Sequence, residues 1–235
     1  MLVLALDTSG AAVTAALHDG STVLARRSTA DARRHAELLA PSVAAVLAEA
    51  GADRTDVTTV AVGVGPGPFT GLRAGIVTAR VLGLALGVDV VGVCSLDALA
   101  LQMGREVPDV VGGRFAVATD ARRHELYWAL YAPGDGEGDA PRRLDGPFVT
   151  APADLPAEVP VTGRGATLYP DRFEPPRGPL DVDAGAVAEL AVLGLSGRSR
   201  PSGRDGTAAL LLPPEPLYLR RPDATPPGAR KRVLA

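Results

Sequence analysis

Two short polar segments follow apolar runs and could bind phosphate. Residues 7–10 (DTSG) offer hydroxyl and backbone N–H groups that can hold phosphate oxygens. Residues 120–124 (DARRH) contain no glycine, so bulky side chains hinder a close backbone approach, although the arginines could bind phosphate directly. Two interpretations stay open: the segments bind a nucleotide, or Asp7 and Asp120 only end two strands. The weak candidate nucleotide-binding residues are Asp7, Thr8 and Ser9.

The glycine- and proline-rich turn at residues 63–71 matches neither common nucleotide-binding motif. A P-loop contains lysine, and Lys231 is the only lysine of the chain. The dinucleotide pattern G-x-G-x-x-G fails because its spacing meets Pro68 or Thr70 in place of glycine. The turn is therefore not predicted to be a phosphate loop of either class.

The residue sets that metal-dependent or nucleophilic catalysis needs are also missing. His18, His35 and His124 are too far apart for a shared helix turn, and no Cys/His cluster has the spacing of a zinc site. Cys94, the only cysteine, ends an apolar run and is predicted to be a small buried hydrophobic residue. No G-x-S-x-G elbow occurs. We therefore predict no catalytic residue and no metal ligand.

Composition limits the class of protein. A single cysteine excludes a disulfide within the chain, and a formal net charge of −3 argues neither for nor against a nucleic-acid partner. The basic residues between 220 and 232 are compatible with RNA contact but are equally typical of a solvated tail. The N-terminus lacks a basic segment before its apolar run, and we expect no apolar run to reach the ~18–20 residues of a membrane span. We expect a soluble, cytoplasmic protein without membrane contact.

Hydrophobic periodicity predicts an α/β protein with an N-terminal mixed five-stranded sheet flanked by helices. Its predicted strands are residues 2–6, 12–18, 22–26, 60–64 and 88–93, and its predicted helices are 33–50, 71–86 and 95–103. Pro41 suggests that residues 35–40 form a separate first turn, and Thr70 is predicted to cap the second helix. The weaker second half is predicted to contain strands 115–120, 126–131 and 159–162, helix 183–195, an extended segment 213–220 and a disordered tail 222–235.

The predicted helix 71–86 is apolar nearly all round, and small residues recur every fourth position along it. Each internal glycine costs about 0.5–1 kcal/mol of helix stability relative to alanine, so a close contact should offset that cost. The small residues either seat the helix on its own sheet or admit a helix of another chain. The sequence favours one buried face on the sheet and a second on another chain. The small residues are Gly71, Gly75, Ala79, Gly83 and Gly87.

Several segments resemble the bacterial TsaB (YeaZ) family. They are LALDTS at the start, RRHAELLAP at 33–41, VGPGPFTGLRAG at 64–75, GVCSLDALA at 92–100, DARRHELYWALY at 120–131 and EPLYLR at 215–220. The resemblance is dense over residues 1–131 and thin over 132–214.

The resemblance implies an actin-like ASKHA (ribonuclease H-like) fold with two subdomains, each a mixed sheet flanked by helices. Residues 1–103 would form the N-terminal subdomain with the dimerisation helices, and residues 104–221 the smaller C-terminal one. Residues 222–235 would be a basic, disordered tail.

The resemblance also implies a noncatalytic scaffold subunit of the complex that makes threonylcarbamoyladenosine in tRNA. Such a subunit pairs with the paralogue TsaD, supports binding of the ATPase TsaE, meets tRNA through the complex and forms a homodimer when alone. TsaD would hold the metal, whereas Ser95 and Leu99 stand here at the positions of its two metal-binding histidines. The expected cofactor is therefore none, with weak ATP or ADP binding at the complex interface left open.

The implied partner interface lies on two helices. The expected residues are His35, Leu39 and Val43 on the first, and Gly71, Leu72, Arg73, Gly75, Ile76, Ala79, Arg80 and Gly83 on the second. The alternative function is an ASKHA-fold ATPase or small-molecule kinase, which residues 7–9 and Asp120 favour.

Overall fold

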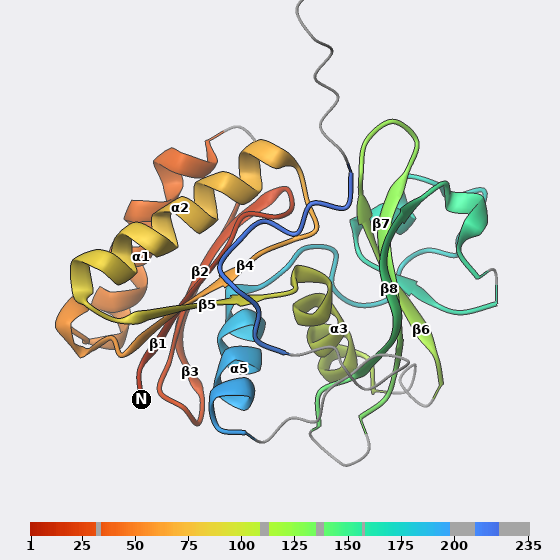
Figure 1. Cartoon of the computed structure of the whole chain (residues 1–235). Helices are drawn as coiled ribbons and strands as arrows, with labels where there is room; N and C mark the ends of the chain where they lie inside the picture. The colour runs from red at the N-terminus through yellow and green to blue at the C-terminus, as the bar shows by residue number, and fades with distance from the viewer. Residues whose placement is uncertain (32–33, 109–112, 135–138, 157, 198–209, 221–235) are drawn as a thin grey trace, which may run out of the picture.

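Two β-sheets, with helices packed on and between them, form the architecture of the computed structural model (Figure 1). The structure describes residues 1–31, 34–108, 113–134, 139–156, 158–197 and 210–220. The predicted tail, 222–235, lies outside the described residues.

The first sheet has five strands in the order β3-β2-β1-β4-β5. β1 is antiparallel to β2 and parallel to β4, and β4 is parallel to β5, so the predicted mixed sheet is confirmed. β1 and β4 are buried along their whole length, which explains their continuous apolar runs. The strands are β1 Val3–Asp7, β2 Ala12–His18, β3 Val23–Ala30, β4 Thr59–Gly63 and β5 Asp89–Val93.

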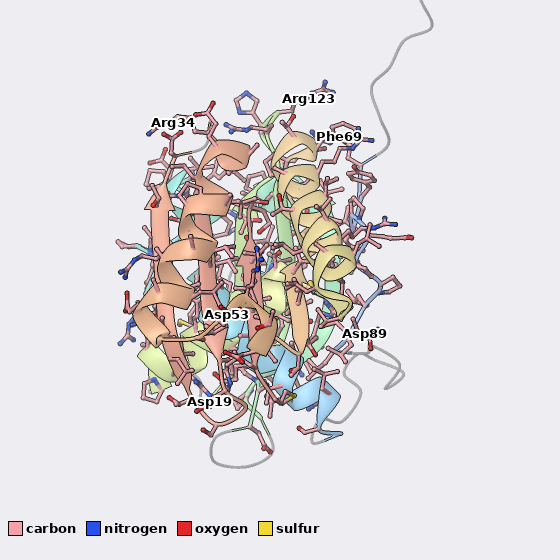
Figure 2. The ribbon with its side chains drawn as sticks, turned by 90° about the vertical axis from the view of Figure 1, so that its left-hand side faces the viewer. Asp19, Arg34, Asp53, Phe69, Asp89 and Arg123 are labelled. Carbon is pink, nitrogen blue, oxygen red and sulfur yellow. The ribbon has the colours of Figure 1, made fainter. Side chains whose placement is uncertain are left out.

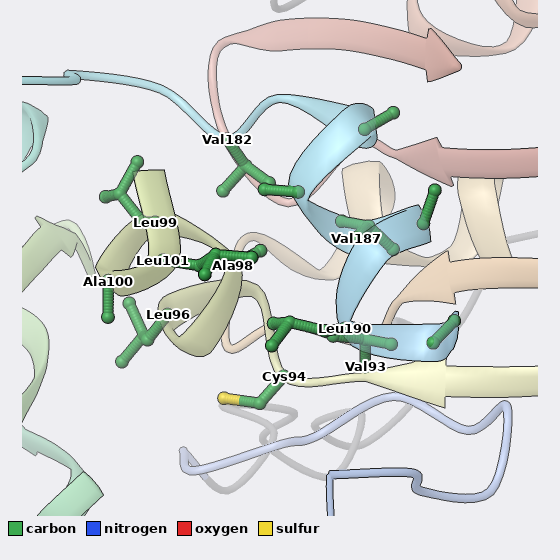
Figure 3. Close-up of a cluster of buried hydrophobic side chains, with 14 of the residues drawn as sticks. Val93, Cys94, Leu96, Ala98, Leu99, Ala100, Leu101, Val182, Val187 and Leu190 are labelled. Atoms are coloured by element: carbon green, nitrogen blue, oxygen red, sulfur yellow. The ribbon is translucent and has the colours of Figure 1, made fainter. Parts of the chain in front are cut away.

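Helices cover both faces of this sheet (Figure 1). Alternate residues of β1 point to opposite faces: Leu4 packs in the core under α1 and α2, and Val3 packs in the core shared with α3 and α5. Figure 3 shows the second core, where Leu190 of α5 approaches the residues that join β5 to α3. The helices are α1 His35–Ala50, α2 Phe69–Leu86, α3 Ser95–Glu106 and α5 Ala184–Leu195.

The second sheet has four strands in the order β8-β7-β6-β9. Three of them fall near the predicted positions, but β8 was not predicted. Gly146, Pro147 and several charged residues obscure its pattern, and it lies at a partly exposed edge where an alternating apolar face is not needed. The strands are β6 Phe115–Asp120, β7 Leu126–Ala132, β8 Arg142–Thr150 and β9 Val161–Thr162, followed by the short helix α4 Arg164–Thr167.

Two local predictions need correction. α1 is continuous through Pro41, because Pro41 is exposed and water can bond the carbonyl that loses its partner. α2 begins at Phe69 with Pro68 as its N-cap, so Thr70 lies inside the first turn and caps nothing. The division at residue 103 stays a prediction, but α5 and residues 210–220 pack back on the first sheet although they follow the second in sequence.

α2 is long and apolar enough, by length and composition alone, to cross a membrane, with a mean hydropathy of 1.4 over 18 residues. The expectation that no segment reaches this length and apolarity is therefore wrong for α2. The test is weak support for a membrane span, because core helices pass it too, and 33% of this window is buried inside the protein.

The small residues of α2 face the protein's own sheet. Gly71, Gly75, Ala79 and Gly83 are buried, and a Cβ atom added at Gly71 would lie 2.5 Å from the carbonyl oxygen of Thr8. A Cβ atom at Gly83 would lie 2.2 Å from Cγ2 of Val90. The interpretation that this strip admits another chain is therefore wrong, because the strip is already in contact with the turn after β1 and with β5.

Replacing Gly71 by alanine should destabilise the protein, although alanine is the better helix former. The new methyl group meets a backbone carbonyl that cannot rotate away, so Gly71→Ala should lower the free energy of unfolding by about 1–3 kcal/mol in urea titrations. Gly113→Ala is the control, because no atom of a described residue lies within 4 Å of a Cβ placed there. A Gly71→Ala variant as stable as the unaltered chain would contradict the close contact.

A buried ion pair joins α3 to the second sheet. Arg143 Nη1 of β8 donates to Asp97 Oδ1 of α3 at 3.1 Å, and the Tyr131 hydroxyl of β7 donates to the same oxygen at 2.7 Å. Both charged side chains are more than 90% buried. Removing either side chain would leave the charge of the other buried and uncompensated, because water cannot replace the lost partner.

Arg143→Met should lower the free energy of unfolding by about 3–5 kcal/mol, because it leaves the Asp97 carboxylate buried without its counter-charge. Adding Asp97→Asn should recover part of that loss, since the uncompensated charge is then removed. Chemical denaturation of the single and double variants measures both effects. A double variant whose loss equals the sum of the single losses would show that the two groups are not coupled.

Candidate functional site

A cleft of about 430 Å³ lies between the two halves of the protein and brings together both candidate phosphate-binding turns. Ser9 lies on one side and Asp120 on the other, so the fold brings the two segments together in space. The polar lining residues are Ser9, His35, Thr70, Thr119, Asp120, Arg122, Arg164 and Asp181.

Asp7, however, does not line the cleft. Its side chain is 1% exposed, and Oδ1 accepts from the backbone N–H and the hydroxyl of Ser9, both at 2.8 Å. Oδ2 accepts from the Ser95 hydroxyl at 2.7 Å, and that hydroxyl accepts from the Gly65 N–H at 3.0 Å. Ser95 thus helps to enclose the carboxylate.

The Thr8 side chain also forms a buried hydrogen bond within the protein, in which its hydroxyl donates to the Gly71 carbonyl at 2.7 Å. Of the three predicted nucleotide-binding residues, only Ser9 reaches the cleft. The side-chain oxygens of Asp7 and Thr8 are hydrogen-bonded inside the protein, and nucleotide binding by these residues stays a prediction.

The opposite turn is built by an unusual backbone. Arg122, Arg123 and His124 have φ angles of +63°, +54° and +61°, a left-handed conformation rare for residues other than glycine. The Arg122 N–H donates to Asp120 Oδ1 at 2.7 Å, and the two side chains form an ion pair at 3.2 Å. No glycine marks this left-handed turn, so the sequence pattern does not predict it.

The charges of the cleft are largely paired within it. Arg164 donates through Nε to Asp181 at 3.0 Å, and Arg122 is paired with Asp120. Two buried side-chain atoms of the residues that line the cleft, Nε2 of His35 and Oγ1 of Thr119, lack a hydrogen-bond partner among the described residues. The cleft can thus bind a small polar group, but over the described residues no three His, Cys, Asp or Glu side chains converge to hold a metal.

Cys94 is a structural residue, as predicted. It is 1% exposed at the edge of the core between α3 and α5 (Figure 3). Burial, followed by the nearby Asp97 charge, raises the pKa of its thiol to about 12. The thiol therefore stays protonated and is a poor nucleophile.

A second surface lies on the outer side of α2, opposite the glycine strip. Four large apolar side chains are exposed there at helical spacing: Phe69 at 49%, Val77 at 57%, Val81 at 58% and Leu84 at 86%. With the exposed Arg73 and Arg80 they form a continuous stripe, which we call the α2 stripe. Figure 2 views this side, with α1 and α2 next to each other in front of the sheet and Phe69 at one end.

The predicted interface residues divide into two groups. Arg73 and Arg80 are exposed on the α2 stripe, and His35 lies at the cleft. The other eight are buried within the protein: Leu39, Val43, Gly71, Leu72, Gly75, Ile76, Ala79 and Gly83. The apolar members of the α2 stripe were left out of the predicted interface, although their 3.6-residue spacing opposite the glycines is a usable signal.

Burial raises the pKa of Asp7, while hydrogen bonds from Ser95 and Ser9 act in the opposite direction. A raised folded-state pKa means that the folded protein binds more protons between the ordinary value of 3.8 and the raised value. Asp7 therefore makes a contribution to stability that falls as pH rises through this range.

Asp7→Asn provides the test, with unfolding free energies measured from pH 3 to 8. We expect the stability of the unaltered chain relative to Asp7→Asn to fall as pH rises above about 4. Asp53→Asn is the control, for which we expect the opposite pH dependence. Hydrogen bonds from Thr55 lower the pKa of Asp53, so the contribution of Asp53 to stability is lost as pH falls. A relative stability that rises with pH for Asp7 would contradict the effect of burial.

Comparison with known proteins identifies the family. The family model of TsaD, tRNA N6-adenosine threonylcarbamoyltransferase, matches residues 22–142. An uncharacterised protein of Mycobacterium tuberculosis is 44% identical over 234 residues, which cover 95% of this chain and 94% of the relative. TsaB of Escherichia coli, a tRNA threonylcarbamoyladenosine biosynthesis protein, is 37% identical over 131 residues, 56% of this chain and 55% of that protein.

A solved structure supports the same family assignment. YeaZ from Pseudomonas aeruginosa superimposes with a TM-score of 0.73 at 30% identity, covering 93% of this chain and 99% of that chain. This likeness confirms the predicted actin-like α/β fold with two mixed sheets flanked by helices. The resemblance drawn from the sequence is thus correct, and the chain belongs to the TsaB (YeaZ) family.

Proposed function

We propose that this chain acts in tRNA threonylcarbamoyladenosine biosynthesis as a noncatalytic scaffold subunit that binds a TsaD-type paralogue through the α2 stripe. Its TsaB relatives from Escherichia coli and Bacillus subtilis carry the name of that pathway. The match to the TsaD family model supports common descent with the proposed partner. Shared descent makes a pseudo-symmetric pairing of related helices plausible on physical grounds, because related helices present surfaces of similar shape.

The exposed apolar face of α2 is the observation that carries the proposal. Ten large apolar side chains are exposed among the described residues, and four of them lie on this one helix. Scattered exposed apolar residues are ordinary, but a contiguous row along a helix marks an interaction surface. The helix is held rigidly on its sheet by the glycine contacts, so the stripe is presented in a fixed orientation.

The state of the cleft supports the noncatalytic part of the proposal. The Asp7 carboxylate is hydrogen-bonded to Ser9 and Ser95 and does not reach the cleft, so it is not placed to bind a metal-nucleotide complex. Leu99, at the position of the second TsaD histidine, is fully buried in the core. A partner would supply the metal.

The remaining parts of the proposal follow from the same family membership. We infer that the complex includes a TsaE-type ATPase, that tRNA is bound by the whole assembly in the cytoplasm, and that the isolated chain forms a homodimer. Any ATP or ADP would bind where the subunits meet.

A second candidate function is ATP hydrolysis or small-molecule phosphorylation in the cleft. It is favoured by Ser9 and Asp120, which face the same cleft, and by the unpartnered Nε2 of His35 and Oγ1 of Thr119. Calorimetry with Mg-ATP distinguishes it from the scaffold function. Saturable binding that Thr119→Val abolishes, with turnover by the isolated chain, would favour the enzyme.

Leu84→Asp should abolish pairing with a TsaD-type protein from the same source and leave folding intact. Leu84 is 86% exposed, so its replacement changes the isolated chain little, whereas a buried carboxylate at the interface should weaken binding by at least about 100-fold. Affinity is measured by calorimetry, and stability by urea denaturation.

Leu24→Asp is the matched control, since Leu24 is 40% exposed on β3, away from α2. It should bind the partner as tightly as the unaltered chain. Undiminished binding by Leu84→Asp would show that the α2 stripe is not the interface.

A further inference from the structure

The exposed side of α2 carries positive charge only. Residues 69–86 include two charged side chains, Arg73 and Arg80, and no acidic residue. The two arginines are seven positions apart, which is two helical turns, so they lie on the same side of the helix with Val77 between them. Neither forms an ion pair with another described residue.

Arg73 is held in one position by aromatic groups. Its guanidinium carbon lies 3.7 Å from the centre of the Phe69 ring, and Nε donates to the Tyr218 hydroxyl at 3.2 Å. The Phe69 and Tyr218 rings stack with centroids 5.4 Å apart. The terminal nitrogens of the guanidinium, which are its bidentate donors, form no hydrogen bond with any described residue.

Tyr218 comes from the C-terminal segment, which runs along the edge of the first sheet to the start of α2 (Figure 1). Leu212 exchanges two backbone hydrogen bonds with Gly92 of β5, at 2.7 and 2.9 Å. The Leu217 N–H donates to the Val64 carbonyl at 2.8 Å. These bonds fix the tyrosine, so the C-terminal segment is part of the surface that presents Arg73.

This charge pattern distinguishes between possible partners. In a two-fold contact of α2 with a second copy, the stripe meets itself and brings Arg73 and Arg80 close to the same arginines of the copy. Like charges facing each other in a desolvated contact are unfavourable, whereas a guanidinium and a carboxylate form a strong paired hydrogen bond. An apolar helix with carboxylates two turns apart satisfies both the apolar residues and the arginines.

We propose that Arg73 and Arg80 select an acidic partner helix over a second copy of this chain, and that Tyr218 positions Arg73 for this contact. The inference rests on the proposed function, because it names the chemistry of the partner at the same surface. It assigns to the C-terminal segment a role in recognition in addition to its role at the sheet edge.

The test is a comparison of two affinities in the double variant Arg73→Leu/Arg80→Leu. Loss of the charges should weaken binding to the TsaD-type partner by about tenfold or more and strengthen self-association by a similar factor. Calorimetry measures the first affinity, and sedimentation equilibrium measures the second. Higher salt should likewise weaken the heteromeric complex and strengthen self-association of the unaltered chain.

Tyr218→Phe tests the positioning role, because it keeps the ring stack and removes the bond to Arg73. It should weaken partner binding by about threefold, and that effect should vanish when Arg73 is already leucine. Arg142→Leu, on β8, is the control and should change neither affinity.

Opposite changes in the two affinities support the proposal, and changes in the same direction, or none, would overturn it. If Leu84→Asp abolishes pairing but the arginine variant binds normally, the scaffold function stands and the charge selection is wrong. If the unaltered chain binds no TsaD-type protein, the proposed function fails, and the self-association measurement still decides whether the arginines oppose a second copy.

Discussion

The structure depends on the close contact between α2 and the turn that follows β1. Gly71 and Gly75 allow the helix backbone to approach Thr8, whose hydroxyl donates to the Gly71 carbonyl at 2.7 Å. No larger residue fits at these positions without displacing the turn. The contact fixes the rotation of α2 about its axis, and so it determines that one side of the helix rests on the sheet while the apolar residues of the α2 stripe face outward.

The same contact explains why the cleft is poorly equipped for nucleotide chemistry. With Thr8 bonded to α2 and Asp7 bonded to Ser9 and Ser95, the polar atoms of the first turn are used inside the protein. These donors and acceptors therefore stabilise the contact between the turn, α2 and the start of α3.

Strong periodic patterns in the sequence predicted the first sheet and its helices well. β1 and β4 are continuous apolar runs, and the Asp19-Gly20 hairpin and the glycine after α1 mark clear ends. The edge strand β8 and the left-handed turn at residues 122–124 were missed, because a half-exposed strand with Gly146 and Pro147 carries little pattern and the turn uses no glycine.

The candidate site was predicted less well, for a reason that lies in tertiary packing. A helix that is apolar all round does not reveal which side meets its own sheet, so the glycine strip was assigned to a partner. The contacts of these glycines with Thr8 and Val90, which only the structure gives, show that the strip faces the sheet. The sequence also placed Asp7 at a phosphate site, since it could not show that Ser95, far away in the chain, encloses the carboxylate.

Hydrogen–deuterium exchange of the chain alone and mixed with a TsaD-type protein tests the central claim most directly. The amides of α2, which carries the α2 stripe, and those of residues 210–220 should become protected in the complex, while exchange in β6 and β7 stays the same. Protection confined to the cleft turns or to the second sheet, with α2 unchanged, would contradict the account.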